Sequence, residues 1–148
     1  MPAAVGVRET RRFRGMATLT REECLKGRHF ADAIATGCIA PLDVHNPAGP
    51  GQAEGVSAAN PAGKDPAPQP YDIPYGCLVP EKVDGLLLAG RCISGTHDAH
   101  ASYRWQSICM GTGAAAGFAA AESILQHQQP RNTDIGPAQK KLGIVRQE

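Results

Sequence analysis

The feature that most restricts the fold is an uncharged run from Trp105 to Ala121 that is rich in glycine and alanine. With its flanks it predicts one long helix from Arg104 to His127, ended by Pro130. Each glycine inside a helix costs about 1 kcal/mol relative to alanine, so close approach of the helix to a sheet or a ligand is expected as compensation. A transmembrane span is the alternative, since Gly113 and Gly117 form a GxxxG pair. We do not expect a span, because the run is shorter than the ~20 residues required and its small side chains contribute little transfer free energy.

A short apolar run, 86–89 (LLLA), precedes this helix and lies between Gly85 and Gly90. The pattern is typical of a fully buried strand in a parallel sheet. Strand, glycine, polar loop and long helix together predict an α/β fold. In such folds, ligands bind at the carboxyl ends of strands and at helix N-termini, where backbone N–H groups and the helix dipole favour negative charge.

Upstream, residues 5–19 read as an extended segment with a turn or bulge at Gly15. Thr20 and Glu23 form a capping-box pattern that predicts a short helix ended by Gly27. An apolar stretch follows at 33–38, and we predict a short strand at 42–45. The segment 46–70 is dense in proline and glycine and predicts a loop or disordered insert, after which 71–80 reads as an edge strand limited by its prolines.

Composition excludes several classes of function. The formal net charge is +1, so nothing points to a nucleic-acid partner. The five cysteines are widely spread and form no CxxC pair, which is typical of reduced thiols in a cytoplasmic protein. A zinc site is disfavoured because no compact set of ligands exists, and a Cys–His nucleophile lacks a suitable helix or turn. We therefore expect no metal.

Several blocks, in order, resemble a bacterial family of FAD-dependent oxidoreductases. They are RETRR at 8–12, LT at 19–20, DAIA at 32–35, DVHNP at 43–47, IPY at 73–75 with Leu78 and Pro80, and LLLAGRCIS at 86–94, followed by His97, Ser102, Arg104, Cys109, Met110, Gly113, Ala116 and Gly117. The resemblance covers most of residues 6–118 and omits the proline-rich segment. It implies FAD as cofactor, a small-molecule substrate, and a fold similar to glutathione reductase-type and succinate dehydrogenase-type flavoproteins.

The resemblance also implies roles for single residues. In such folds the last strand and the helix after it return to the FAD domain, and the helix N-terminus points at the pyrimidine edge of the flavin. The cofactor-binding candidates are Gly90, Arg91, Ser94, Ser102 and Ser107. The physical reason is sound, because reduced flavin gathers negative charge at that edge.

The substrate side of the site is expected around the histidines and the basic segment. His97 is a candidate hydrogen-bond donor or acid–base group, or else a histidine held by loop backbone. Arg104 is a candidate catalytic anion clamp, or a helix-start residue paired with Asp98. Arg8, Arg11 and His100 are candidates for substrate binding, and the arginines could equally form an exposed strand face or interdomain salt bridges.

Flavoproteins of this kind bind the FAD pyrophosphate with a GxGxxG turn, which this sequence lacks. The expectation is a C-terminal segment of an FAD-dependent oxidoreductase, inactive alone, that needs an N-terminal portion or subunit carrying GxGxxG. Its parts are 1–80 from a substrate or cap domain, 81–129 from the FAD-binding domain, and a peripheral polar tail at 130–148. Such a piece would be marginally folded or would associate, and a homo-oligomer is one form that this association could take. The alternative is a non-catalytic remnant or interaction module that binds no FAD.

Overall fold

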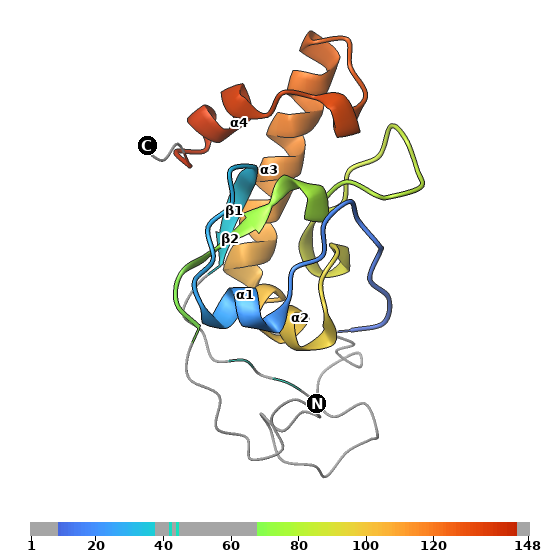
Figure 1. The fold of residues 1–148 in the computed structure, drawn as a ribbon. Helices are drawn as coiled ribbons and strands as arrows, with labels where there is room; N and C mark the ends of the chain where they lie inside the picture. The colour runs from blue at the N-terminus through green and yellow to red at the C-terminus, as the bar shows by residue number, and fades with distance from the viewer. Residues whose placement is uncertain (1–8, 38–41, 43, 45–67, 145–148) are drawn as a thin grey trace, which may run out of the picture.

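The computed structural model describes residues 9–37, 42, 44 and 68–144. A long helix, α3, forms the spine of this part (Figure 1). A two-stranded sheet packs on its middle, α1 and α2 lie at one end, and α4 lies against its other half. The elements in chain order are α1 Arg21–Leu25, β1 Ala33–Gly37, β2 Tyr71–Pro74, η1 Tyr75–Cys77, η2 Gly90–Cys92, α2 His97–Tyr103, α3 Gln106–Leu125, η3 Pro130–Asn132 and α4 Gly136–Lys141.

Helix α1 starts and ends as the sequence predicts. Thr20 accepts from the backbone N–H of Glu23, and the Glu23 side chain accepts from the backbone N–H of Thr20, which completes the capping box. Gly27 follows the last turn with φ of 61°, a left-handed conformation that glycine adopts without strain. Local sequence therefore determines both ends of this helix.

Strands β1 and β2 pair antiparallel, with Ala35 opposite Ile73 and Gly37 opposite Tyr71. The Tyr71 ring lies over Gly37 so closely that a Cβ there would overlap it, which explains why a residue without a side chain occupies this position. The predicted strand at 42–45 is not formed by Leu42 or Val44, which are buried but irregular, and its other two residues lie outside the described part. The proline-rich segment also lies outside it up to residue 67.

The predicted long helix is found as α3, Gln106–Leu125, within two residues of its expected start and end. A separate helix, α2, occupies His97–Tyr103, where the sequence predicted a polar loop, and the extended backbone of Trp105 lies between the two helices. By length and hydropathy α3 is one candidate for a membrane span, which is weak evidence because the core helices of globular proteins also meet this criterion. One side of α3 packs against β1, α4, η2 and η3. The buried side of α3 consists of Ile108, Thr112, Ala115, Ala119, Glu122 and Ser123.

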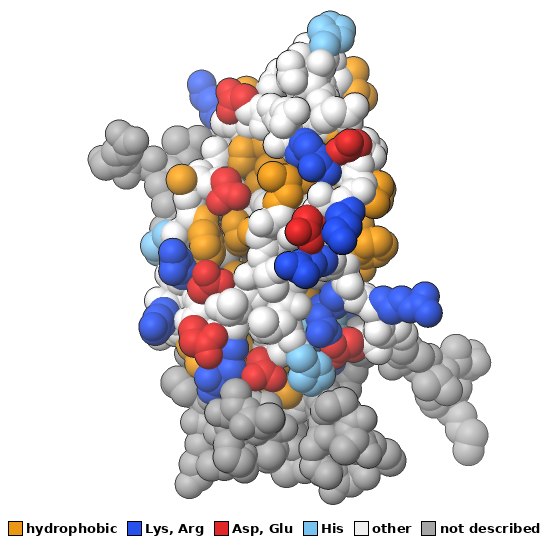
Figure 2. Space-filling view, turned by 45° about the vertical axis from the view of Figure 1, so that its right-hand side comes forward, with side chains coloured by type: hydrophobic (Ala, Val, Ile, Leu, Met, Phe, Trp, Pro, Cys, Tyr) orange, Lys and Arg blue, Asp and Glu red, His pale blue; other side chains and the backbone are white. Residues whose placement is uncertain are grey.

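The rest of the α3 surface is open and partly apolar. Met110 and Ile124 are 75% and 73% exposed, and hydrophobic side chains reach the surface between charged ones in Figure 2. A Cβ added at Gly111, Gly113 or Gly117 would meet no atom within 4 Å. The close approach expected at these glycines is therefore absent from the described residues, and their cost in helix stability is not offset within them.

The predicted buried strand at 86–89 is wrong for this structure. The segment forms no strand and belongs to no sheet among the described residues, Leu86 is 39% exposed, and only Leu88 is buried. Among the described residues, its backbone makes one hydrogen bond of the kind found in sheets, from the Leu88 N–H to Leu78 O at 2.8 Å. The physical reason is that the described residues supply no parallel strand beside it, so an apolar run is left without a ladder.

The C-terminal tail is less peripheral than expected. Helix α4 buries Ala138 against α3 and β1, and Ile135 joins the same core. The Lys141 ammonium donates to the largely buried carboxylate of Glu122 at 2.9 Å, which ties α4 to α3. Residues as far as Leu142 therefore belong to the packed fold.

Candidate active site

An extended N-terminal segment, residues 9–19, lies along the loop that follows η2. The Phe13 N–H donates to Cys92 O at 3.0 Å, and the Leu19 N–H donates to Ser94 O at 3.2 Å. The Thr96 N–H returns to Leu19 O at 2.9 Å, next to the parallel bridge between Leu19 and Gly95. The two stretches that the sequence separates by about eighty positions are thus side by side.

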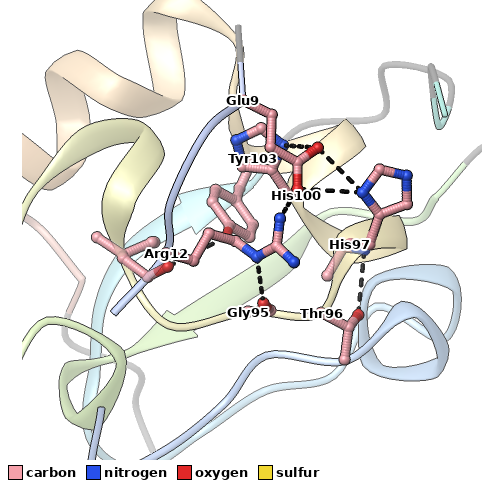
Figure 3. A network of polar contacts seen from close by, with 9 residues as sticks. Glu9, Arg12, Gly95, Thr96, His97, His100 and Tyr103 are labelled. Atoms are coloured by element: carbon pink, nitrogen blue, oxygen red, sulfur yellow. Dashed lines mark hydrogen bonds and ion pairs between the residues drawn. The ribbon is translucent and has the colours of Figure 1, made fainter. Parts of the chain in front are cut away.

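The Glu9 carboxylate lies at the centre of a polar cluster at this junction (Figure 3). His97 Nδ1 is 3.1 Å from Glu9 Oε1 and 3.0 Å from Oε2. His100 Nδ1 is 3.4 Å from Glu9 Oε2, and the Arg12 guanidinium forms an ion pair with Glu9 Oε1. One carboxylate therefore faces two imidazoles and a guanidinium, which we call the Glu9 cluster.

Arg12 and the cluster are anchored to the loop backbone. Arg12 Nε donates to Gly95 O at 2.9 Å. Gly95 is in turn packed on Tyr103, whose Oη would lie 2.8 Å from a Cβ at that position. The Tyr103 hydroxyl donates to Ile93 O at 3.2 Å, and burial raises the pKa of Tyr103, so its phenol stays neutral. Glycine at 95 lets the backbone carbonyl and the Tyr103 ring share the same small space.

His100 is the most enclosed member of the cluster. It is 1% exposed, and neither ring nitrogen makes a hydrogen bond among the described residues. Its ring meets the edge of Tyr103 at 5.3 Å between centroids and 89° between planes. Burial, with added repulsion from Arg12 and Arg104, lowers the pKa of His100 to about 4, so the ring is neutral near pH 7.

An open cavity of about 460 Å³ adjoins the cluster. It is lined by side chains of both charge signs and by three hydroxyl residues, two of which, Thr18 and Ser94, have their oxygens 2.9 Å apart. Ser94 itself is almost completely buried, with 1% of its surface exposed. The lining residues are Glu9, Thr10, Arg12, Phe13, Arg14, Thr18, Ser94 and Gly95.

The predicted flavin-edge residues fall into two groups. Gly90 has φ of 72°, and its N–H donates to Thr112 Oγ1 at 2.9 Å, which fastens η2 to α3. Arg91 and Ser107 are exposed. Trp105 is the N-cap residue of α3, and its side chain makes no capping hydrogen bond to the first turn. The first turn of this 20-residue helix therefore has an exposed serine and no side-chain cap.

Other candidates are placed differently. Ser102 is fully buried, and its hydroxyl forms a 2.8 Å hydrogen bond with that of Tyr71, so it lies in the core rather than at an open wall. Arg11 is exposed, and Arg104 is half-buried at the C-cap of α2. Arg8 lies outside the described residues.

Comparison with known proteins decides the family. The model of the family described as FAD dependent oxidoreductase matches residues 1–142. The chain belongs to the FAD-dependent oxidoreductase family. No curated protein and no solved structure matches it. The family identifies FAD as the cofactor and agrees with the resemblance that the sequence blocks carry.

The site of this FAD-dependent oxidoreductase fits one half of the cofactor. The uncapped start of α3 and the exposed Arg91 suit the electron-rich edge of an isoalloxazine ring. The residues present do not provide a binding turn for the FAD pyrophosphate, since the sequence contains no GxGxxG. No group of three or more metal-ligating side chains was found among the residues that the structure describes.

Sequence reasoning missed the central residue of the cluster. Glu9 enters the sequence analysis only as one residue of the RETRR segment, although it is the sole acidic residue in a basic run and is distinguished by that. Gly95 and Tyr103 were also missed, because their roles arise from packing across separate segments. Thr112, which holds Gly90, lies inside a small-residue helix where no pattern distinguishes it.

Proposed function

We propose that this chain forms the wall of an FAD site at the pyrimidine edge of the flavin, together with part of the substrate site. The observation that carries the proposal is the pairing of residues 9–19 with the loop after η2. This pairing places the basic segment, both histidines and an open cavity together, close in sequence to the start of α3. The family resemblance implies that the basic segment and both histidines lie on the substrate or flavin side.

Each group has a defined task in this proposal. Arg91 and the first-turn N–H groups of α3 would hold the flavin edge and stabilise negative charge there. Gly90 holds η2 against α3 through the hydrogen bond from its N–H to Thr112 Oγ1. FAD, when bound, supplies two-electron redox chemistry. Ser107 lies exposed in the same first turn and can donate a hydrogen bond.

The cavity and the Glu9 cluster would receive a small substrate. Arg12 and Arg14, with the hydroxyls of Thr18 and Ser94, can bind polar or anionic groups. His97 can donate, accept or move a proton, since its ring is 34% exposed. His100, neutral and buried, supports the wall from behind, and Arg11 and Arg104 remain candidates for anion contacts.

The ADP half of FAD would come from a polypeptide portion that carries GxGxxG, because this sequence has no such turn. The open apolar face of α3 suits packing against that portion. We place the assembled oxidoreductase in the cytoplasm. A homo-oligomer that uses the same face is the second arrangement we consider, and a module without FAD is the second function.

A titration with three flavins tests this proposal. Riboflavin, FMN and FAD are added to the purified chain, and binding is followed by flavin fluorescence. We expect weak and equal binding of all three, with no competition by ADP, because only the ring edge is held. Arg91→Met should weaken binding several-fold, whereas Lys26→Met, an exposed site on α1, should not. Tight stoichiometric FAD would overturn the half-site proposal, and no binding of any flavin would favour the module without FAD.

A further inference from the structure

The wall of the open cavity holds two hydroxyls that differ in exposure. Thr18 Oγ1 and Ser94 Oγ are 2.9 Å apart, and this is the one hydrogen bond of either hydroxyl among the described residues. Ser94 is 1% exposed, whereas Thr18 is an exposed residue. If Thr18 donated to Ser94, the single hydrogen of the Ser94 hydroxyl would be buried without an acceptor, which is costly. Ser94 therefore donates to Thr18, and the hydrogen of Thr18 is left to point outward.

Three neighbours hold Ser94 in a fixed position. Its N–H donates to Cys77 O at 2.9 Å, and its carbonyl accepts from the Leu19 N–H at 3.2 Å. Gly15 lies so close that a Cβ at that position would be 2.9 Å from the Cβ of Ser94. Backbone contacts and packing therefore set the place of Ser94, and its hydroxyl is free to direct the hydroxyl of Thr18 before any ligand is bound.

The remaining polar groups of the cavity are mainly donors. Arg12 and Arg14 line it, and a guanidinium group can only donate. The one carboxylate of the lining, Glu9, already faces Arg12 and two imidazole nitrogens. Arg14 pairs through Nε with Glu81, at 2.9 Å and outside the lining, which leaves its other N–H groups. The cavity thus offers donors to a group with acceptor oxygens, and because each arginine is already paired, it suits one negative charge better than two.

We propose that Thr18 is a specificity-determining residue of this cavity, that Ser94 positions its hydroxyl as a donor, and that the group selected is a carboxylate of a small substrate. The role toward substrate rests on the proposed function. The Thr18 O–H donates to one carboxylate oxygen, and the unused N–H groups of Arg12 and Arg14 donate to the same group, since hydrogen bonds to a charged acceptor are the strong ones. An amine is rejected because its hydrogens would face these donors.

The experiment titrates the whole ¹⁵N-labelled chain with acetate at about pH 8, where carboxylates are ionised. Ionic strength is held constant, and binding is followed by the amide shifts of the lining residues. Acetate should shift them to saturation. Acetamide, a neutral compound of the same shape, and methylammonium should not, and inorganic phosphate should bind no more tightly than acetate.

Variants separate the two hydroxyls. Thr18→Val should weaken acetate binding about tenfold, the loss of one hydrogen bond to a charged group, and Thr18→Ser should keep it. Thr36→Val, at an exposed threonine of β1 outside the lining, is the matched control and should change nothing. Ser94→Ala keeps the Cβ beside Gly15 and frees the Thr18 hydroxyl to take three staggered positions in place of one, so acetate binding should weaken about threefold.

A double-mutant cycle tests whether Ser94 acts through Thr18. Ser94→Ala should have no further effect in the Thr18→Val background, whereas a merely structural role would weaken binding equally in both backgrounds and would overturn the positioning role. Amide spectra show whether each variant keeps the fold, and Ser94→Cys, whose thiol is a weak donor, replaces Ser94→Ala if the latter unfolds.

Three other results would overturn the proposal: no binding of acetate, equal binding of acetamide, or tighter binding of phosphate. No flavin is present in this titration. Acetate binding together with a failed flavin titration would refute the proposed function alone, and flavin binding without acetate binding would refute the carboxylate site alone.

Discussion

Replacing the three glycines of α3 by alanine tests whether this helix face is open. A Cβ added at Gly111, Gly113 or Gly117 meets nothing within 4 Å in the described part of the chain, so no contact there is gained or lost. The effect should then be helix propensity alone, about 1 kcal/mol for each position. The triple variant should gain about 2–3 kcal/mol in the free energy of unfolding, a large share of the 5–15 kcal/mol typical of a domain.

Urea unfolding followed by circular dichroism measures this gain. The midpoint should rise while the slope with urea stays constant, because the surface exposed on unfolding hardly changes. Ala121→Gly, at an exposed position of the same helix, is the matched control and should lose about 1 kcal/mol. Sedimentation of each variant confirms that the same species is being compared.

A less stable triple variant would refute the reasoning, since it would mean that another copy or another part of the chain covers the three positions. The proposed assembly also predicts that the same substitutions change the strength of association, in the opposite direction to their effect on stability. If the portion with GxGxxG packs on this face, the added methyl groups should weaken its association while they stabilise the isolated chain. Opposite effects on stability and assembly would identify the glycines as a contact site.

Further expectations concern the core and the buried groups. Gly37→Ala should cost about 1–3 kcal/mol, because its Cβ would overlap the ring of Tyr71, and thermal unfolding would show this as a lower midpoint. The pKa of His100, about 4 in the fold against 6.5 ordinarily, means that the unfolded chain binds more protons between these values. Stability is therefore full above about pH 6.5 and should fall by up to about 3 kcal/mol toward pH 4, a loss that His100→Leu should abolish in urea unfolding at both pH values. Burial raises the pKa of Cys24 and Cys77 to about 12, so neither thiol should react with Ellman's reagent at about pH 8 until the chain is unfolded.

The parts of the fold that sequence predicted well depend on neighbours in the chain. The capping box of Thr20 and Glu23 and the left-handed Gly27 are contacts within a few residues, and both are found. The long small-residue helix is also found, because its pattern extends over five turns. The short helix α2 before it was not predicted, since the polar residues at 97–103 show no helical pattern and α2 packs on α1, which is far away in the sequence.

The parts that failed depend on partners far along the chain. The apolar run at 86–89 has the composition of a buried strand, yet a strand exists only where another backbone completes its hydrogen bonds. The same limit applies to the site. His97 and His100 were recognised as candidates, but their common partner Glu9 lies 88 and 91 positions away, and no period or spacing connects them.

The described residues divide the proposed active site into a self-sufficient part and a dependent part. In the Glu9 cluster, Arg12 pairs with Glu9 and donates to Gly95 O, and His97 Nδ1 lies 3.0 Å from Glu9 Oε2, so these contacts are made within this chain. The start of α3 has no side-chain cap, and its outer face exposes methionine, isoleucine and bare glycine backbone. A flavin edge would interact with the uncapped N–H groups at the start of α3, and an apolar protein surface would cover its exposed outer face. The contacts of the Glu9 cluster should therefore persist in the isolated chain, whereas tight cofactor binding should appear only when the second portion is supplied.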